Sequence, residues 1–190
     1  FLFRDKTEFN SDISDWDVSN GINFAGMFYG AASFNQDIGD WDVSNGTDFS
    51  SMFRETAFNH DIGDWDVSNG TNFGGMFSNA TAFNQDLGDW NVSNGTNFGA
   101  MFRSTSFNQD IGDWDVSNGT AFFHMFIDNK VFNQDIGDWD VSNSRDFVAM
   151  FRNAEAFNQD LGDWDVSEAV GMANMFYGSS FDQDIGNWDV

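Results

Sequence analysis

The chain contains no cysteine and no proline, only two histidines, and 7 basic residues against 31 acidic ones. Without cysteine, a disulfide framework, a thiol nucleophile, a zinc ribbon and a haem-attachment motif are excluded. The formal charge of −24 disfavours contact with nucleic acid or an anionic membrane surface, because like charges repel. No apolar stretch approaches the length of a membrane span, and the start of the sequence lacks a signal-peptide pattern. We therefore expect neither nucleic-acid binding nor direct membrane insertion of this segment.

Aromatic residues are abundant, by contrast. The chain holds 24 Phe and 8 Trp, whereas disordered acidic segments are poor in aromatic side chains. A folded chain with a large apolar core is therefore expected.

A repeat of 24 or 25 residues runs through the whole sequence. Each copy opens with a Phe, in blocks such as FNQDIGDWDVSN, and the openers are Phe9, Phe34, Phe58, Phe83, Phe107, Phe132, Phe157 and Phe181. We expect residues 1–190 to form one repeat domain of about seven and a half copies. Because the sequence begins and ends inside a copy, we also expect a piece of a longer chain or a subunit that stacks end to end.

The copy from Phe34 to Ala57 illustrates the structure that the pattern predicts. Apolar and acidic residues alternate over Trp41–Val43, which is the signature of a strand, and the SNG run after it is typical of a turn. The segment Phe49–Phe53 then has apolar residues at positions i, i+3 and i+4, which predicts a short helix.

A unit of this size cannot bury its apolar face alone, so the copies should stack. Each apolar position then forms a column, and one column holds all the tryptophans: Trp16, Trp41, Trp65, Trp90, Trp114, Trp139, Trp164 and Trp188. Stacked strands lie ~4.8 Å apart and helices ~8–10 Å apart. Short parallel strands on one side and helical segments on the other therefore predict a curved α/β solenoid with the strands inside. A straight all-β solenoid is the alternative if the second segment is extended.

The run MFYGAASFNQDIGDWDVSNGTDF resembles the BspA-like leucine-rich repeat surface proteins and the related mycoplasma lipoprotein repeats of unknown function. The resemblance covers essentially all 190 residues. It implies a solenoid of leucine-rich-repeat type, a cell-surface or extracellular location, and a role in attachment or surface structure. In that family the position of Gly46 is usually Val and that of Phe49 usually Met, so this chain pairs a smaller residue with a larger one and the exchange looks compensatory.

Three acidic columns follow from the same alignment: the first contains Asp37, the second Asp40 and the third Asp42. At ~4.8 Å in water, each like-charged pair costs roughly 0.9 kcal/mol. The first column suits carboxylates bound to backbone donors in a turn. The other two are either solvated or face a cofactor, which would be calcium or a similar hard cation. The candidate ligands are Asp40, Asp42, Asp64, Asp66, Asp113, Asp115, Asp138 and Asp140.

Two asparagine columns, which contain Asn35 and Asn45, predict amide side chains that bond to neighbouring rungs. Some asparagines also stand in Asn-x-Thr sequons, which makes them glycosylation candidates in a eukaryotic secreted protein. These are Asn45, Asn69, Asn79, Asn94 and Asn118.

Arginine recurs in every second copy after the MF or LF pair, at Arg4, Arg54, Arg103 and Arg152. This spacing is either a relic of duplication of a two-copy unit, or a line of cations that docks against the acidic face of another copy of the chain.

Catalysis needs one constellation of different groups in one place, whereas this sequence spreads the same groups over every copy. His60 and His124 fall in different columns, which indicates surface variation. We expect a non-catalytic structural or assembly protein that forms filaments by end-to-end or lateral association. The alternative is an adhesion module that recognises a glycan or a protein, with or without calcium.

Overall fold

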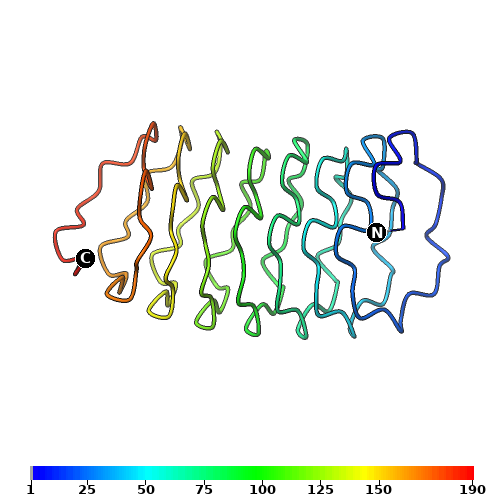
Figure 1. The fold of residues 1–190 in the computed structure, drawn as a ribbon, viewed down its shortest axis with the longest axis horizontal. Helices are drawn as coiled ribbons and strands as arrows, with labels where there is room; N and C mark the ends of the chain where they lie inside the picture. The colour runs from blue at the N-terminus through cyan, green and yellow to red at the C-terminus, as the bar shows by residue number, and fades with distance from the viewer. Residues whose placement is uncertain (1) are drawn as a thin grey trace.

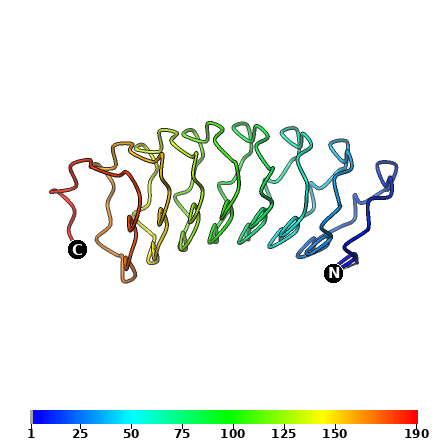
Figure 2. The ribbon, with the colours of Figure 1, turned by 90° about the horizontal axis from the view of Figure 1, so that it is seen from above.

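The computed structural model describes residues 2–190. Each repeat forms one coil of chain, and the coils stand side by side in a single row with the two termini at opposite ends (Figure 1). Viewed from above, the row is gently bowed (Figure 2). Within the described part of the chain, no helix has the length and apolar character of a membrane span.

The coils contain neither helices nor extended strands over residues 2–190. In the described part of the chain, the only ladder-type pairings are isolated parallel bridges, one residue long, between neighbouring coils. The bridges are Asn23–Asp48, Asp48–Asn72, Asn72–Asn97, Asn97–Ala121, Ala121–Asp146 and Asp146–Gly171. The predicted α/β solenoid of leucine-rich-repeat type, with a strand and a helix per rung, is therefore wrong. The straight all-β alternative fails as well, because its strands are missing.

The predicted helix is replaced by turns because two residues of each coil adopt a positive φ, four positions apart. In one coil these are Ser51 (φ 54°) and Glu55 (φ 61°). A right-handed helix does not accommodate such residues. The equivalents are Gly26, Gly75, Ala100, His124, Ala149 and Asn174 at the first position and Asp5, Gly30, Asn79, Ser104, Asp128, Asn153 and Gly178 at the second. The frequent Gly and Asn at these positions are the local signal for this conformation.

The predicted strand is replaced by two tight turns. The N–H of Trp41 donates to the carbonyl of Ile38, and the N–H of Gly46 donates to that of Val43. Aspartate side chains hold the same stretch, as described below. Asp side chains that bond to nearby backbone offer the chain an alternative to a sheet ladder. The alternation of apolar and acidic residues therefore reflects turn geometry and not a pleated strand.

Backbone hydrogen bonds between coils concentrate along residues 47–55 and their equivalents, which we call the laddered side. Here some backbone N–H groups donate to a carbonyl of the next coil, and others donate to a carbonyl of their own coil. The N–H of Phe49 and that of Ser51 donate to the next coil, at Asn72 and Gly74, whereas the N–H of Met52 closes a turn within its own coil. This alternation satisfies the backbone without a helix or a sheet.

The opposite, acidic side comprises residues 37–43 and their equivalents, and its coils lie farther apart. Ring centroids of Phe49, Phe73 and Phe98 step by 5.8 and 5.7 Å on the laddered side. The indoles of Trp114, Trp139 and Trp164 step by 6.4 and 6.5 Å. Because the steps differ across the coil, the row curves, with the laddered side inside.

The core consists of the predicted apolar columns. Phe53, Phe58, Ile62, Trp65 and Val67 are at most 3% exposed. Within a coil the two phenylalanines that flank the loop stack face to face, as Phe53 and Phe58 do with centroids 4.0 Å apart. The indoles of Trp114, Trp139, Trp164 and Trp188 lie parallel from one coil to the next, with interplanar angles of 2–5°. The predicted stacking of Trp upon Trp is therefore confirmed for these coils.

The compensating glycine is confirmed too. A Cβ atom on Gly46 would overlap the ring tip of Phe49 and lie 2.9 Å from the Val43 carbonyl oxygen. The missing side chain therefore makes room for the larger ring.

Candidate functional site

The first acidic column is structural, as predicted. In every copy its Asp Oδ1 accepts a bond from the backbone N–H two residues later, as Asp61 does from Gly63 at 2.9 Å. The same bond recurs at Asp12, Asp37, Asp86, Asp110, Asp135, Asp160 and Asp184. These carboxylates hold the turn that begins the acidic side.

The third acidic column is structural as well, and its partner was missed from the sequence. Oδ1 of Asp42 accepts bonds from the hydroxyl (2.6 Å) and the backbone N–H (3.1 Å) of Ser44. These two bonds lower the pKa of the Asp42 carboxyl, and the bond from the hydroxyl has the larger effect. Asn91 replaces the aspartate in one copy and keeps both contacts, to Ser93. The constant spacing of Asp or Asn and Ser in the D-V-S run is the signal that could have revealed this turn.

The predicted cation pairs join the second and third columns, but the structure brings together the first and second. An open hollow of about 190 Å³ between two coils is lined by Asp86, Asp89, Asp110 and Asp113. Over residues 2–190, no three acidic or imidazole groups are arranged to hold a metal ion. Calcium takes roughly six to eight oxygen ligands. Oδ1 of Asp42 is engaged by Ser44, and calcium at the predicted aspartates stays a prediction.

The two asparagine columns form amide ladders, as predicted. The N–H of Asn59 donates to Oδ1 of Asn35 in the preceding coil at 2.9 Å. Nδ2 of Asn69 donates to the carbonyl of Ser44 at 2.8 Å. Four sequon asparagines belong to this second ladder and are exposed: Asn45, Asn69, Asn94 and Asn118. Asn79 is half-buried and has a positive φ (60°). Glycosylation of these five stays a prediction.

The arginines that recur in every second copy share one column on the laddered side, here called the Arg column. Two other copies have a tyrosine at the same position. Tyr29 lies between two guanidinium groups: the Cζ of Arg4 is 4.7 Å from its ring centroid and that of Arg54 is 5.1 Å away. Arg152 lies over Tyr177 at 5.3 Å. Nε of Arg103 is buried without a hydrogen-bond partner. The sequence pattern revealed these arginines, whereas Tyr29 and Tyr177 in the same column were missed.

The two histidines lie in different environments. His60 Nε2 is 3.1 Å from the Asn35 carbonyl, the contact that glutamine makes in other copies. His124 has a positive φ (58°), and burial, followed by the charge of Arg103, lowers the pKa of its imidazole. The structure does not bring the two together.

A groove of about 470 Å³ lies on the laddered side near the start of the row. Its lining includes Arg4, Tyr29, Asn23 and Asp48. Its remaining lining residues are small: Ala25, Gly26, Ser50 and Ser51. The equivalents of Ser50 vary widely along the row, from Gly74 and Gly99 to Phe123 and Val148. Variation between copies is thus concentrated on this side.

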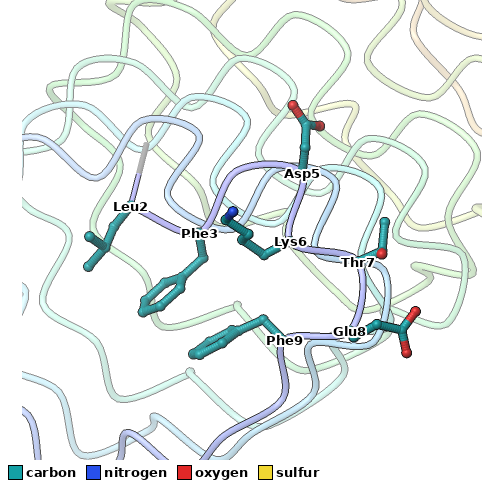
Figure 3. A pocket seen from close by; sticks show the side chains of 7 residues that line it. All are labelled: Leu2, Phe3, Asp5, Lys6, Thr7, Glu8 and Phe9. Atoms are coloured by element: carbon teal, nitrogen blue, oxygen red, sulfur yellow. The ribbon is translucent and has the colours of Figure 1, made fainter.

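A cavity of about 580 Å³ lies over the first coil and includes Leu2, Phe3 and Phe9 (Figure 3). The two rings stack at 3.8 Å, the same pair that each later coil contains. The cavity is therefore lined by the ordinary core residues of a coil and shows no side-chain arrangement that is specific to this position.

A family model described as "Mycoplasma protein of unknown function, DUF285" matches residues 1–62, 54–136 and 104–190. This confirms the mycoplasma part of the resemblance, whereas the assignment to BspA-like leucine-rich repeats is not confirmed. No curated protein and no solved structure matches the chain.

Proposed function

The chain belongs to this Mycoplasma repeat family of unknown function, and we propose that it serves as a non-catalytic structural module at the cell surface or outside the cell. The observation that carries the proposal is that neighbouring coils are joined by the same hydrogen bonds along the whole row. Trp65 Nε1, for example, donates to the Ile38 carbonyl of the preceding coil at 3.1 Å, and each later tryptophan repeats this bond. In such a row each coil is held in place by its two neighbours, and the row as a whole forms a stiff spacer. The extracellular placement rests on the resemblance to surface-protein repeats.

The non-catalytic part of the proposal rests on where the reactive side chains lie. Aspartates of two columns are occupied in turns, and His60 replaces a ladder glutamine. An active site needs one acid, base or nucleophile that differs from its neighbours in position and environment.

Lateral assembly is the second part of the proposal. Arg4, Arg54, Arg103 and Arg152 lie at every second coil, and the acidic columns of a second copy present an aspartate at nearly every coil. Each arginine can therefore meet an aspartate of the second copy. Ion pairs between exposed groups weaken with salt. Light scattering should show particles that shrink between 20 mM and 500 mM salt, and an unchanged size would exclude this contact.

A binding module is the second candidate function, favoured by the groove and by the variation on the laddered side. Binding surfaces of repeat proteins are built from positions that differ between repeats, whereas core and ladder positions stay constant. The partner in this reading is a glycan or another protein.

Electron microscopy of the purified protein, with calcium and with a chelator, tests the structural proposal. We expect stiff rods or lateral bundles of rods under both conditions. Round particles or a flexible chain of beads would contradict it.

A further inference from the structure

We propose that repulsion between carboxylates on the acidic side bends the row, so that the row straightens when salt screens these charges. The spacer would then change its curvature with ionic strength. The proposal rests on the stacked coils of the structural function above and goes beyond it. A row whose curvature stays constant would remove this inference and leave the structural function standing.

The coils fan open from the laddered side towards the acidic side. On the laddered side, the ring centroids of Phe53 and Phe77 are 5.7 Å apart. The opening phenylalanines, which stack on that column, step by 6.3 Å between Phe58 and Phe83. The indoles on the acidic side step by 6.4–6.5 Å. Each coil is therefore a wedge whose thick end carries the acidic columns, and a row of such wedges is bowed (Figure 2).

Charge is distributed as unevenly as these steps. The three acidic columns hold 22 of the 31 acidic residues, and none of the 7 basic residues stands on the acidic side. Arg54, Lys130 and Arg145 form ion pairs elsewhere, with glutamates. The aspartates of the second column are exposed in every copy. Because like charges in water repel over a Debye length of ~10 Å at 0.1 M salt, each of these carboxylates repels those of the neighbouring coils.

The two sides also differ in how firmly neighbouring coils are joined. On the laddered side, the backbone N–H groups of Phe49, Ser51 and Phe53 all donate to the next coil at 2.9 Å. On the acidic side, the bond between coils comes from an indole, as from Trp65 Nε1 to the Ile38 carbonyl at 3.1 Å. The laddered side is therefore the hinge, and repulsion acts at the far end of the lever. Aromatic pairs are favourable with centroids about 4.5–7 Å apart, so the indoles have room to approach.

One natural residue shows that a charge of the second column can be removed. Asn187 stands in this column in the last copy. The quadruple variant Asp64→Asn/Asp89→Asn/Asp113→Asn/Asp138→Asn repeats that exchange in four successive coils. Since the turns are held by aspartates of the first and third columns, the variant removes charge and leaves the turn bonds in place.

A matched control variant removes four charges away from the acidic side. It combines Glu8→Gln, Glu155→Gln, Glu168→Gln and Asp182→Asn, all at exposed positions. Both variants change the net charge of the chain by the same amount, so a difference between them reports where the charge lies.

The test is pulsed electron–electron double resonance on two label pairs, each five coils apart. Asp40→Cys/Asp163→Cys spans the acidic side, and Ile22→Cys/Arg145→Cys spans the laddered side. Labelled chains are diluted with unlabelled protein, at a concentration where light scattering shows single chains. Narrow distance distributions check that each variant is folded.

We expect the acidic-side distance to shorten by about 1–3 Å between 20 mM and 500 mM salt, because the steps of the two sides differ by about 0.7 Å per coil (6.4–6.5 against 5.7–5.8 Å). The laddered-side distance should stay constant. At 20 mM salt the quadruple variant should already be shorter than the parent on the acidic side and should respond less to salt. The matched control variant should keep both the distance and the salt response of the parent.

Three outcomes would overturn the proposal. An acidic-side distance that stays constant with salt would show that packing alone sets the curvature. Equal shortening on both sides would show that the whole stack compacts without straightening. Equal shortening in the matched control variant would assign the effect to net charge and not to the acidic side. The salt series on the parent decides the matter even if the quadruple variant fails to fold.

Discussion

Replacing Gly70 by alanine tests the fit between glycine and phenylalanine that recurs from Gly21 to Gly119, with Ser144 beside Phe147 as the exception. A Cβ atom at this position would overlap the ring tip of Phe73 and lie 2.9 Å from the Val67 carbonyl oxygen. The ring has no room to retreat, because Phe73 is fully buried and stacks between Phe49 and Phe98 at 5.8 and 5.7 Å. The added methyl group therefore has to push a stacked column apart.

The expected magnitude follows from two opposed terms. Overpacking a well-packed core costs about 1–3 kcal/mol. Removing a glycine returns about 0.4–1 kcal/mol, because the unfolded chain loses freedom. The free energy of unfolding should therefore fall by about 1–2 kcal/mol for Gly70→Ala, measured as a lower urea midpoint at unchanged m-value.

A double-mutant cycle isolates the contact. The last such position of the chain pairs Ala169 with Met172, so the double variant copies a pair that the chain already contains. Phe73→Met alone should destabilise, and the double variant Gly70→Ala/Phe73→Met should be more stable than the sum of the two by about 1 kcal/mol or more. Additivity within about 0.5 kcal/mol would refute the reasoning.

Three further predictions concern other contacts. Ser144 stands where most coils have glycine and is fully buried, with its hydroxyl unpaired; Ser144→Gly should raise the free energy of unfolding by about 0.5–1 kcal/mol after the entropy cost of glycine, seen as a higher urea midpoint, and a lower midpoint would contradict this. Trp114→Phe removes the bond from Nε1 to the Leu87 carbonyl (2.9 Å) and leaves a gap; it should cost about 2–4 kcal/mol in urea unfolding, and a loss below about 1 kcal/mol would mean that the bond is unimportant. Hydrogen bonds from Ser44, Ser68, Ser117 and Ser167 lower the pKa of the third-column aspartates below the ordinary 3.8 in the folded chain. Their contribution to stability is therefore present above about pH 4 and is lost as the pH falls through the folded pKa values. Changing Asp42, Asp66, Asp115 and Asp165 to Asn, as at Asn91, should shrink the loss of thermal stability between pH 4 and pH 2; an unchanged loss would assign the acid sensitivity to other groups.

The sequence was a good guide to what is buried and what stacks. The tryptophan column, the phenylalanine columns and both amide ladders follow from the repeat alone, because a column that is apolar or amide-bearing in every copy has few other uses in a stack. Hydrophobic periodicity measures burial, however, and not backbone conformation. Phe49, Met52 and Phe53 all point inward, as a helix would place them, yet Ser51 between them has a positive φ.

The candidate sites were harder to predict for a similar reason. A column of identical carboxylates has the same appearance in the sequence whether it faces solvent, a cation or a serine. Only the spacing of Asp42 and Ser44 distinguishes the third column from the second, and that spacing also fits a strand. The groove depends on Arg4, Tyr29 and Asp48 meeting from three coils, which requires knowing that these segments lie on the inside of the curve.

Distances between spin labels test the central claim, that each copy is one coil stacked on the next. Because the chain has no cysteine, pairs introduced at exposed positions of the second acidic column can be labelled cleanly, with Asp40 combined in turn with Asp113, Asp138 and Asp163. Pulsed electron–electron double resonance should give narrow distributions of the distance between the two labels. The mean distance should grow by one equal step per added coil, close to the 6.4–6.5 Å between neighbouring indoles. Broad distributions, or means that do not rise from three to four to five coils, would show that the copies do not stack.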